Sequence, residues 1–421
     1  MRDAAQSQPV KQKIFIALAC ALMAAISLPP FYNSLATVVM FLYWLFFVAK
    51  KFNTKNRLLV VLISALFWIS LVGLTYTQNM EEAKFRIFEQ KILLLVYPLV
   101  FLTAGVDKDK VVRWLVSCFV VVIAAICLVS LGEAILYWLQ HQSADHFFSH
   151  GLAQFLDIYP YVLSLLCLAS VIMLMEAYLG NCVLLSFLSS RLLIVGLIIF
   201  FSAFIALFSV VQVILAWFIL AVIYSFRLTA SRRGLLIVLG AMALAVVLAV
   251  LLIPPLNKKV NETFFGKLNT IPLDRDASLG FVPWNGIAMR KAVWTCSMDV
   301  IKDNFWLGVG TGDGQDLLQQ AYEKRQFYFA SRYNRFNTHN QYLQTLVNFG
   351  AVGLALWLGS LALLFVYFKN NPMALSLLAI CVWSMLTESM LETNKGIVAM
   401  ALLLSFSALM TLRPSGKKYF F

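Results

Sequence analysis

Residues suited to phosphate chemistry and to acid–base chemistry share one long polar stretch, residues 254–341. Arg290 and Lys291 lie in it, and His339 stands near its end. A guanidinium matches the geometry of phosphate, and a histidine can act as a general base near neutral pH. The types and order of these residues therefore predict an anion site and make His339 a candidate base. For His339 alone, a second interpretation is a helix-start residue that is hydrogen-bonded to nearby backbone.

Seven basic residues between 290 and 335 support the anion site. They are Arg290, Lys291, Lys302, Lys324, Arg325, Arg332 and Arg335. Eight acidic residues are interspersed within 254–341, so a lobe with a mixed charged surface is the competing interpretation. Anion binding is favoured, because a loop that has been translocated across the membrane ordinarily carries few basic residues, and this one carries many.

Two other patterns invite a ligand and do not support one. His141, His146 and His150 have no cysteine or clustered carboxylate beside them, so a solvated interfacial segment is favoured and no metal is predicted. The glycines of 308–314 lack the strand and helix that surround a nucleotide-binding loop, and a tight turn is the better interpretation.

The composition predicts a membrane protein with many spans. Hydrophobic residues make up 61% of the 421 residues and charged residues only 13%, about half the share found in soluble domains. The mean hydropathy is +0.83. In such a chain the net charge of +13 is better explained by basic residues flanking membrane helices than by nucleic acid. Membrane lipids are therefore expected partners.

Apolar segments near the length of a membrane span predict twelve transmembrane helices. The segments are 14–28, 35–49, 58–75, 92–104, 111–131, 159–178, two within 191–226, 235–253, 342–368, 374–390 and 396–412. The pair within 191–226 would turn near 209–212. The chain is thus divided into helices 1–9 (residues 1–253), one large loop (254–341), and helices 10–12 with a basic tail (342–421).

The basic turns predict which side each loop occupies. Residues 50–57, 107–113, 227–233, 369 and 413–418 fall on one side with the N-terminus, which is the cytoplasm by the positive-inside rule. Both termini would be cytoplasmic, with an uncleaved first helix. The large loop, an amphipathic interfacial segment at 77–91, Gln212 and a charged turn at 388–395 would share the opposite face. Whether Glu388 and Glu392 reach the site is left open.

Three motifs follow one another in the second half of the chain. Arg290 comes first, then the glycine run 308–314 that contains Asp313, then His339-Asn340-Gln341-Tyr342. In this order the motifs resemble the O-antigen ligase family, over roughly residues 190–410. The same domain is shared with O-antigen polymerases and some protein O-oligosaccharyltransferases, and the motifs separate these members poorly.

The resemblance implies a C-type glycosyltransferase-like, all-helical enzyme of the bacterial inner membrane, acting in lipopolysaccharide biosynthesis. It would transfer a polysaccharide from undecaprenyl diphosphate to a sugar hydroxyl of lipid A-core on the periplasmic face. It would be metal-independent and inverting, with no cofactor and no nucleic-acid partner. His339 would be the base and Arg290 would hold the diphosphate. Further substrate-binding residues are expected at Arg332, Arg335, Asn340, Tyr342, Gln212 and Lys291.

One position departs from the family pattern. The family has another arginine at the outer end of the helix pair, where this chain has Gln212. Arg332 or Arg335 would compensate, or the chain is a diverged or weakly active member. A transporter of lipid-linked sugar is the alternative from another class, and it would place ionisable residues within its spans. Here the charges cluster at one face, which favours catalysis at the membrane surface over transport.

Overall fold

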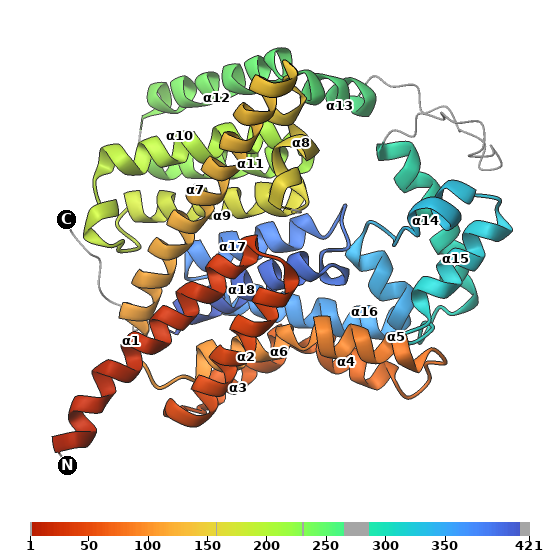
Figure 1. Cartoon of the computed structure of the whole chain (residues 1–421), viewed down its shortest axis with the longest axis horizontal. Helices are drawn as coiled ribbons and strands as arrows, with labels where there is room; N and C mark the ends of the chain where they lie inside the picture. Colours follow the sequence, from red (N-terminus) through yellow and green to blue (C-terminus); the bar gives the residue numbers. More distant parts are fainter. Residues whose placement is uncertain (1, 157, 230, 265–285, 413–421) are drawn as a thin grey trace.

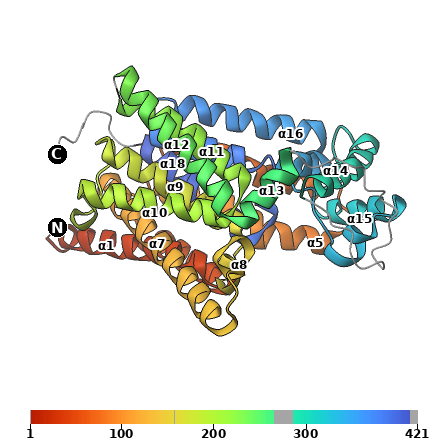
Figure 2. The same ribbon diagram turned by 90° about the horizontal axis from the view of Figure 1, so that it is seen from above.

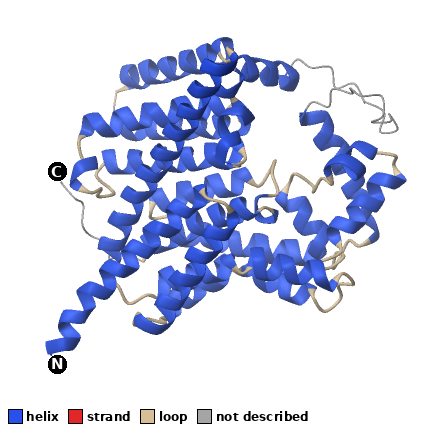
Figure 3. Cartoon of the chain, viewed as in Figure 1, coloured by secondary structure: helices blue, strands red, loops and turns tan. Residues whose placement is uncertain are grey.

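The chain folds into helices throughout the part that the structure describes. The computed structural model describes residues 2–156, 158–229, 231–264 and 286–412. Figure 3 shows helices and loops within these ranges, and the one β-bridge joins Lys50 to Ala104. The predicted all-helical fold is confirmed. Residues 265–285 of the predicted large loop lie outside the described ranges.

The first half of the chain contributes eleven helices that matter for the site. They are α1 (Arg2–Ala24), α2 (Pro30–Phe47), α3 (Thr54–Ile63), α4 (Ala65–Gly73), α5 (Met80–Phe85), the π-helix η2 (Arg86–Lys91), α6 (Leu93–Thr103), α7 (Lys108–His141), α8 (Ser149–Ala153), α9 (Pro160–Tyr178) and α10 (Arg191–Phe208).

The second half contributes ten more. They are α11 (Val211–Leu228), α12 (Arg232–Leu252), α13 (Pro254–Phe264), α14 (Gly286–Asp303), α15 (Gly314–Lys324), the π-helix η7 (Phe329–Asn334), α16 (Gln341–Phe368), α17 (Pro372–Ser384), the short 3-10 helix η8 (Met390–Glu392) and α18 (Asn394–Thr411).

Each predicted span coincides with a helix, but not every helix is long enough to cross a membrane. Among the described residues, eight helices are long and apolar enough, namely α2, α7, α9, α10, α11, α12, α16 and α18. The pair α3–α4 makes a ninth if its 56° bend lies within one span. With 11 and 13 residues, α6 and α17 fall short of the roughly 20 that a span needs. The chain is a polytopic membrane protein, and the count of twelve stays a prediction.

Two helices form the centre of the bundle. Nearly every residue of α9 and α18 is buried, because α9 packs on α10 and α17 while α18 packs on α6 and α17. In contrast, none of the apolar window of α12 is buried, and Figure 1 shows this helix along the edge of the molecule. The predicted turn between the paired helices is confirmed, since α10 ends at Phe208 and α11 begins at Val211.

Polar elements from distant parts of the chain gather at one end of the bundle. In Figures 1 and 2, α5, α8, α13, α14 and α15 lie toward one end, and both termini lie toward the other. The loop between α17 and α18 also reaches this polar end, because it contacts the start of α16. The fold therefore places the large loop, the segment 77–91 and the turn 388–395 together. Which side of a membrane this end faces stays a prediction.

Candidate active site

The turn before α16 fixes the position of His339. The side chain of Asn340 accepts a hydrogen bond from the N–H of Leu343 (3.0 Å) and so caps the helix. The indole N–H of Trp294 in α14 donates to the carbonyl of Thr338 (2.9 Å), and the hydroxyls of Thr338 and Ser389 lie 3.2 Å apart. The turn is therefore held between α14 and the loop that follows α17.

His339 has an unusual backbone and one unpaired ring nitrogen. Its φ is +46°, in the left-handed region that few residues other than glycine adopt, and its N–H donates to the side chain of Asn337 (2.9 Å). Nδ1 lies 3.2 Å from Glu388 Oε2, while Nε2 is buried without a hydrogen-bond partner among the described residues. Because a carboxylate can only accept, Nδ1 carries the proton and Nε2 of the neutral ring is free to accept one.

Arg290 reaches the same carboxylate from α14. Its Nη2 donates to Glu388 Oε1 (2.6 Å), its Nε to the carbonyl of Thr387 (3.2 Å) and its Nη1 to the carbonyl of Gly286 (3.2 Å). A guanidinium has five N–H groups, so these three bonds leave two for a ligand. Glu388 therefore joins Arg290 and His339 in one cluster, which we call the Arg–Glu–His cluster.

Two further titratable side chains interact electrostatically with this cluster. Burial lowers the pKa of His150 in α8, the charge of Lys259 lowers it further, and Glu388 opposes both. Burial also lowers the pKa of Lys259 in α13, with Arg290 acting in the same direction and Glu262 against it. No sequence motif marks Lys259, because residues 254–264 have the composition of the beginning of a loop.

Gln212 lies beside the cluster with its amide already engaged. Its Oε1 accepts from the hydroxyl of Tyr161 (2.7 Å) and its Nε2 donates to the carbonyl of Trp383 (2.5 Å). Tyr161 also donates to the carbonyl of Ser384 (2.9 Å). These contacts join α9, α11 and α17. The side chain of Gln212 therefore helps to hold the end of α17, from which the loop with Glu388 begins.

The other residues expected to bind substrate are not all close to the cluster. Arg332 is 60% exposed and pairs with Glu323, and Arg335 is 67% exposed and pairs with Asp316. Among the described residues, the ion pairs of these arginines are with Glu323 and Asp316, and their expected role in place of an arginine at the helix turn stays a prediction.

Two of the remaining expected residues have other settings. The hydroxyl of Tyr342 donates to the carbonyl of Val382 (2.8 Å), which ties α16 to α17. Lys291 is exposed on α14. Of the expected site residues, Arg290, His339 and Asn340 therefore lie together in the described structure, and their roles stay predictions.

A buried ion pair fixes the loop between α17 and α18 to η2, and the sequence did not reveal it. Glu392 accepts from Lys91 (2.6 Å) and from Arg86 (2.8 Å), and Gln341 Nε2 also donates to it (3.2 Å). The expected interfacial segment 77–91 is helical, but Lys91 is only 1% exposed instead of solvated. The pairing with Glu392 is what permits this burial.

The remaining histidines do not form a metal site in the described structure. His141 and His146 stack on the ring of Tyr137, whereas His150 faces Tyr159. Among the described residues, no group of three or more His, Cys, Asp or Glu side chains is arranged to hold a metal ion.

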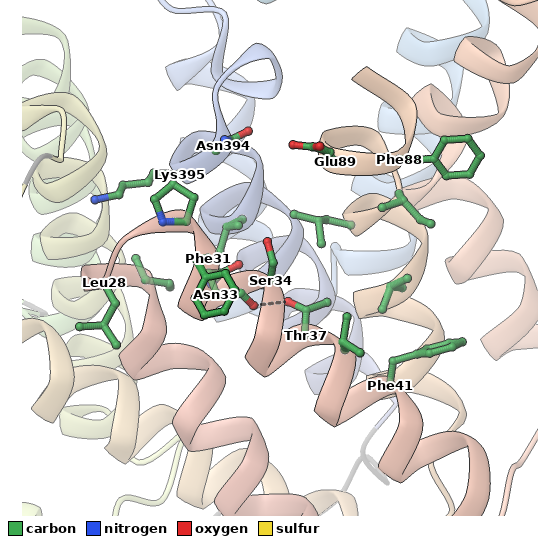
Figure 4. Close-up of a pocket in the computed structure, with 17 residues that line it drawn as sticks. Leu28, Phe31, Asn33, Ser34, Thr37, Phe41, Phe88, Glu89, Asn394 and Lys395 are labelled. Atoms are coloured by element: carbon green, nitrogen blue, oxygen red, sulfur yellow. Dashed lines mark hydrogen bonds between the residues drawn. The ribbon is translucent and has the colours of Figure 1, made fainter. Parts of the chain in front are cut away.

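A separate hollow of about 600 Å³ lies between α2, η2 and the start of α18 (Figure 4). Its lining is mainly apolar, with Phe31 and Phe41 from α2 and Phe88 from η2. Polar groups line other parts of the hollow, among them Asn394 and Lys395 at the start of α18. This lining suits a hydrocarbon chain better than a sugar.

The fold and the site together define the class of protein. The chain is a polytopic membrane protein whose arginine, carboxylate and histidine meet at one end of its helices. A family model described as O-antigen ligase matches residues 195–358, a region that contains both Arg290 and His339. The predicted resemblance to the O-antigen ligase family is confirmed over these residues. No curated protein matches the sequence. The family supports glycan transfer of the ligase or polymerase type in general.

Proposed function

We propose that this protein is an O-antigen ligase that transfers a polysaccharide from undecaprenyl diphosphate to a sugar hydroxyl of lipid A-core. One observation carries the proposal. Glu388 contacts Nδ1 of His339 and Nη2 of Arg290, so Nε2 of the neutral ring is left to accept a proton, and the guanidinium beside it keeps two N–H groups for a ligand. A base beside an anion-binding group is what transfer from a diphosphate donor to a hydroxyl requires.

The chemical step is a single displacement at the anomeric carbon of the donor. His339 Nε2 accepts the proton of the acceptor hydroxyl while its oxygen forms the new glycosidic bond. The bond between the anomeric carbon and the diphosphate oxygen breaks, and the diphosphate leaves on its lipid. Attack from the face opposite the leaving group inverts the anomeric configuration.

Charge develops on the leaving diphosphate during this step. Arg290 is suited to stabilise that charge, because its two spare N–H groups can bind phosphate oxygens in a bidentate manner. The transition state would then need no metal ion, and we expect transfer to continue in the presence of a chelator.

The site is expected on the periplasmic face of the bacterial inner membrane, with both termini in the cytoplasm. The short basic turns at 50–57 and 227–233 support this orientation. An O-antigen polymerase or a protein O-oligosaccharyltransferase would use the same chemistry with another acceptor. A transporter of lipid-linked sugar would have no use for a base with a fixed tautomer.

The first test is transfer by the purified full chain in lipid nanodiscs. Undecaprenyl-diphosphate-linked glycan is the donor and lipid A-core the acceptor, with and without EDTA. Chelator-resistant transfer to lipid A-core is the expected result. Donor chains that only lengthen one another would identify a polymerase, and no reaction with either acceptor would reject glycan transfer with these substrates.

His339→Ala is expected to lower the transfer rate by about 10²–10⁴-fold, because the variant loses a general base. The matched control is His141→Ala, whose ring is exposed and stacks on Tyr137 away from the cluster. Equal elution on size-exclusion chromatography would show that both variants fold. Wild-type turnover in His339→Ala would remove this residue from the mechanism.

A further inference from the structure

Lys259 is a half-buried cation that faces only neutral atoms at hydrogen-bond distance. Its Nζ donates to the hydroxyl of Ser149 (3.0 Å) and to the carbonyl of Ser209 (3.0 Å). Ser209 is the left-handed residue that ends α10, and Ser149 begins α8. The ammonium therefore bridges two chain turns at the polar end of the bundle.

No carboxylate within the described residues forms an ion pair with Lys259. Glu262, one turn further along α13, acts on it electrostatically without forming an ion pair in the described structure. A buried charge without a counterion is costly, and proteins ordinarily pair such groups or place them where an ion binds. The amphipathic helix explains how the charge arrives there: Leu256 is buried, while Lys258 and Asn261 are exposed.

The uncompensated charge belongs to the surroundings of the Arg–Glu–His cluster. The positive charge of Arg290 acts on Lys259, and Lys259 and Glu388 both act on His150. Since Glu388 already neutralises Arg290, Lys259 supplies the excess positive charge on this side of the cluster. A diphosphate ester carries more negative charge than one such arginine can balance.

We propose that Lys259 binds the diphosphate of the lipid-linked donor together with Arg290, as a second cation on the leaving group. This inference rests on the proposed function for the identity of the donor. The ammonium would exchange its two neutral acceptors, Ser149 Oγ and Ser209 O, for phosphate oxygens, which form stronger, charge-assisted bonds. In this arrangement α13 positions the donor, although the sequence places it outside every recognisable motif.

The test compares Lys259→Gln with Lys258→Gln in the full chain, reconstituted in nanodiscs. Both variants remove one positive charge from adjacent residues, but Lys258 is exposed on the outer side of α13. At saturating acceptor, we expect Lys259→Gln to raise the KM for the undecaprenyl-diphosphate donor by about tenfold to hundredfold, the range for a lost bond to a charged group. Lys258→Gln should keep the wild-type KM, and Lys259→Arg should recover part of the loss.

A binding measurement separates this inference from the proposed function. Isothermal titration with farnesyl diphosphate and farnesyl monophosphate should show that wild type prefers the diphosphate and that Lys259→Gln loses this preference. A donor KM and a diphosphate preference unchanged in Lys259→Gln, with transfer intact in wild type, would overturn the role of Lys259 and leave the ligase standing. Lys259-dependent diphosphate binding without any transfer would support the role of Lys259 and reject the ligase. The absence of both binding and transfer would reject the role of Lys259 and the ligase together.

Discussion

At the scale of single residues, Glu388 holds the candidate site together. One of its oxygens accepts from Arg290 and the other from His339, so a single carboxylate orients both groups. Its negative charge also stabilises the imidazolium that forms when His339 takes a proton. Glu388 touches no reacting atom in the proposed step and is a positioning residue.

Glu388→Gln is expected to lower kcat by at least about tenfold while the KM for the donor changes less. The amide cannot stabilise the imidazolium, and it can present its N–H₂ to His339 and so favour the wrong tautomer. Initial rates at saturating donor and acceptor give kcat, and Glu388→Asp should recover part of it. A purely structural role would instead lower the amount of folded protein and leave kcat per folded molecule unchanged.

At the scale of elements, the glycine run between α14 and α15 locks the large loop to the bundle. Helix α16 is broken at Gly350 (φ +62°), and the N–H groups of Val309 and Gly310 donate to the carbonyls of Val347 and Asn348 at this break. Asp313 accepts from the backbone N–H groups of Gln78 and Asn79. The run is therefore a structural joint, in agreement with the tight turn predicted from its glycines.

Gly312→Ala is expected to weaken this joint. A Cβ at Gly312 would lie 2.0 Å from the carbonyl oxygen of Asn79, so the chain must shift, at a cost of about 1–3 kcal/mol. Gly359→Ala in α16 is the control, because a Cβ there meets nothing within 4 Å. Thermal unfolding in detergent should show a lower apparent Tm for Gly312→Ala than for wild type, and no lower Tm for Gly359→Ala. An equal Tm in the two variants would contradict the close approach.

At the scale of the whole molecule, the Lys91–Glu392 pair joins the first quarter of the chain to η8, just before its last helix. Burial by itself would raise the pKa of Glu392, but the charges of Lys91 and Arg86 and the amide of Gln341 outweigh it and hold this pKa below its ordinary value. A carboxyl with a lowered pKa stabilises the folded state above its unfolded pKa. The unfolded pKa of a glutamate is about 4.3. The stability is therefore lost below about pH 4.3, as the pH falls through the lower pKa of the folded state.

Glu392→Gln is expected to destabilise the protein by about 3–5 kcal/mol at neutral pH, because the 1% exposed Lys91 then remains buried with too little compensating charge. The apparent Tm in detergent measures the effect, and its fall below pH 4.3 should be smaller in the variant than in wild type. Adding Lys91→Met should restore much of the Tm. If the double variant were no more stable than Glu392→Gln, the pair would not be the cause.

The sequence by itself determined the helical fold and the residues that carry the family motifs. Long apolar segments leave the backbone no partner but itself in a membrane, so most helices could be read from composition. Arg290 and His339 stand in local motifs, and the break between α10 and α11 falls at the predicted residues. Such features depend on neighbours along the chain, which a sequence shows directly.

Only the tertiary structure decided which side chains meet. Glu388 is 49 residues from His339 and 98 from Arg290, and Lys91 is 301 residues from Glu392. Nothing in the local pattern distinguishes these charges from solvated ones, because their burial depends on how α14, α16 and the loop after α17 pack. The same packing brought Lys259 against Ser149 and Ser209 and left Arg332 and Arg335 in ion pairs at the surface. Pairing of charges across such separations is a property of the folded chain, since only folding removes them from water together.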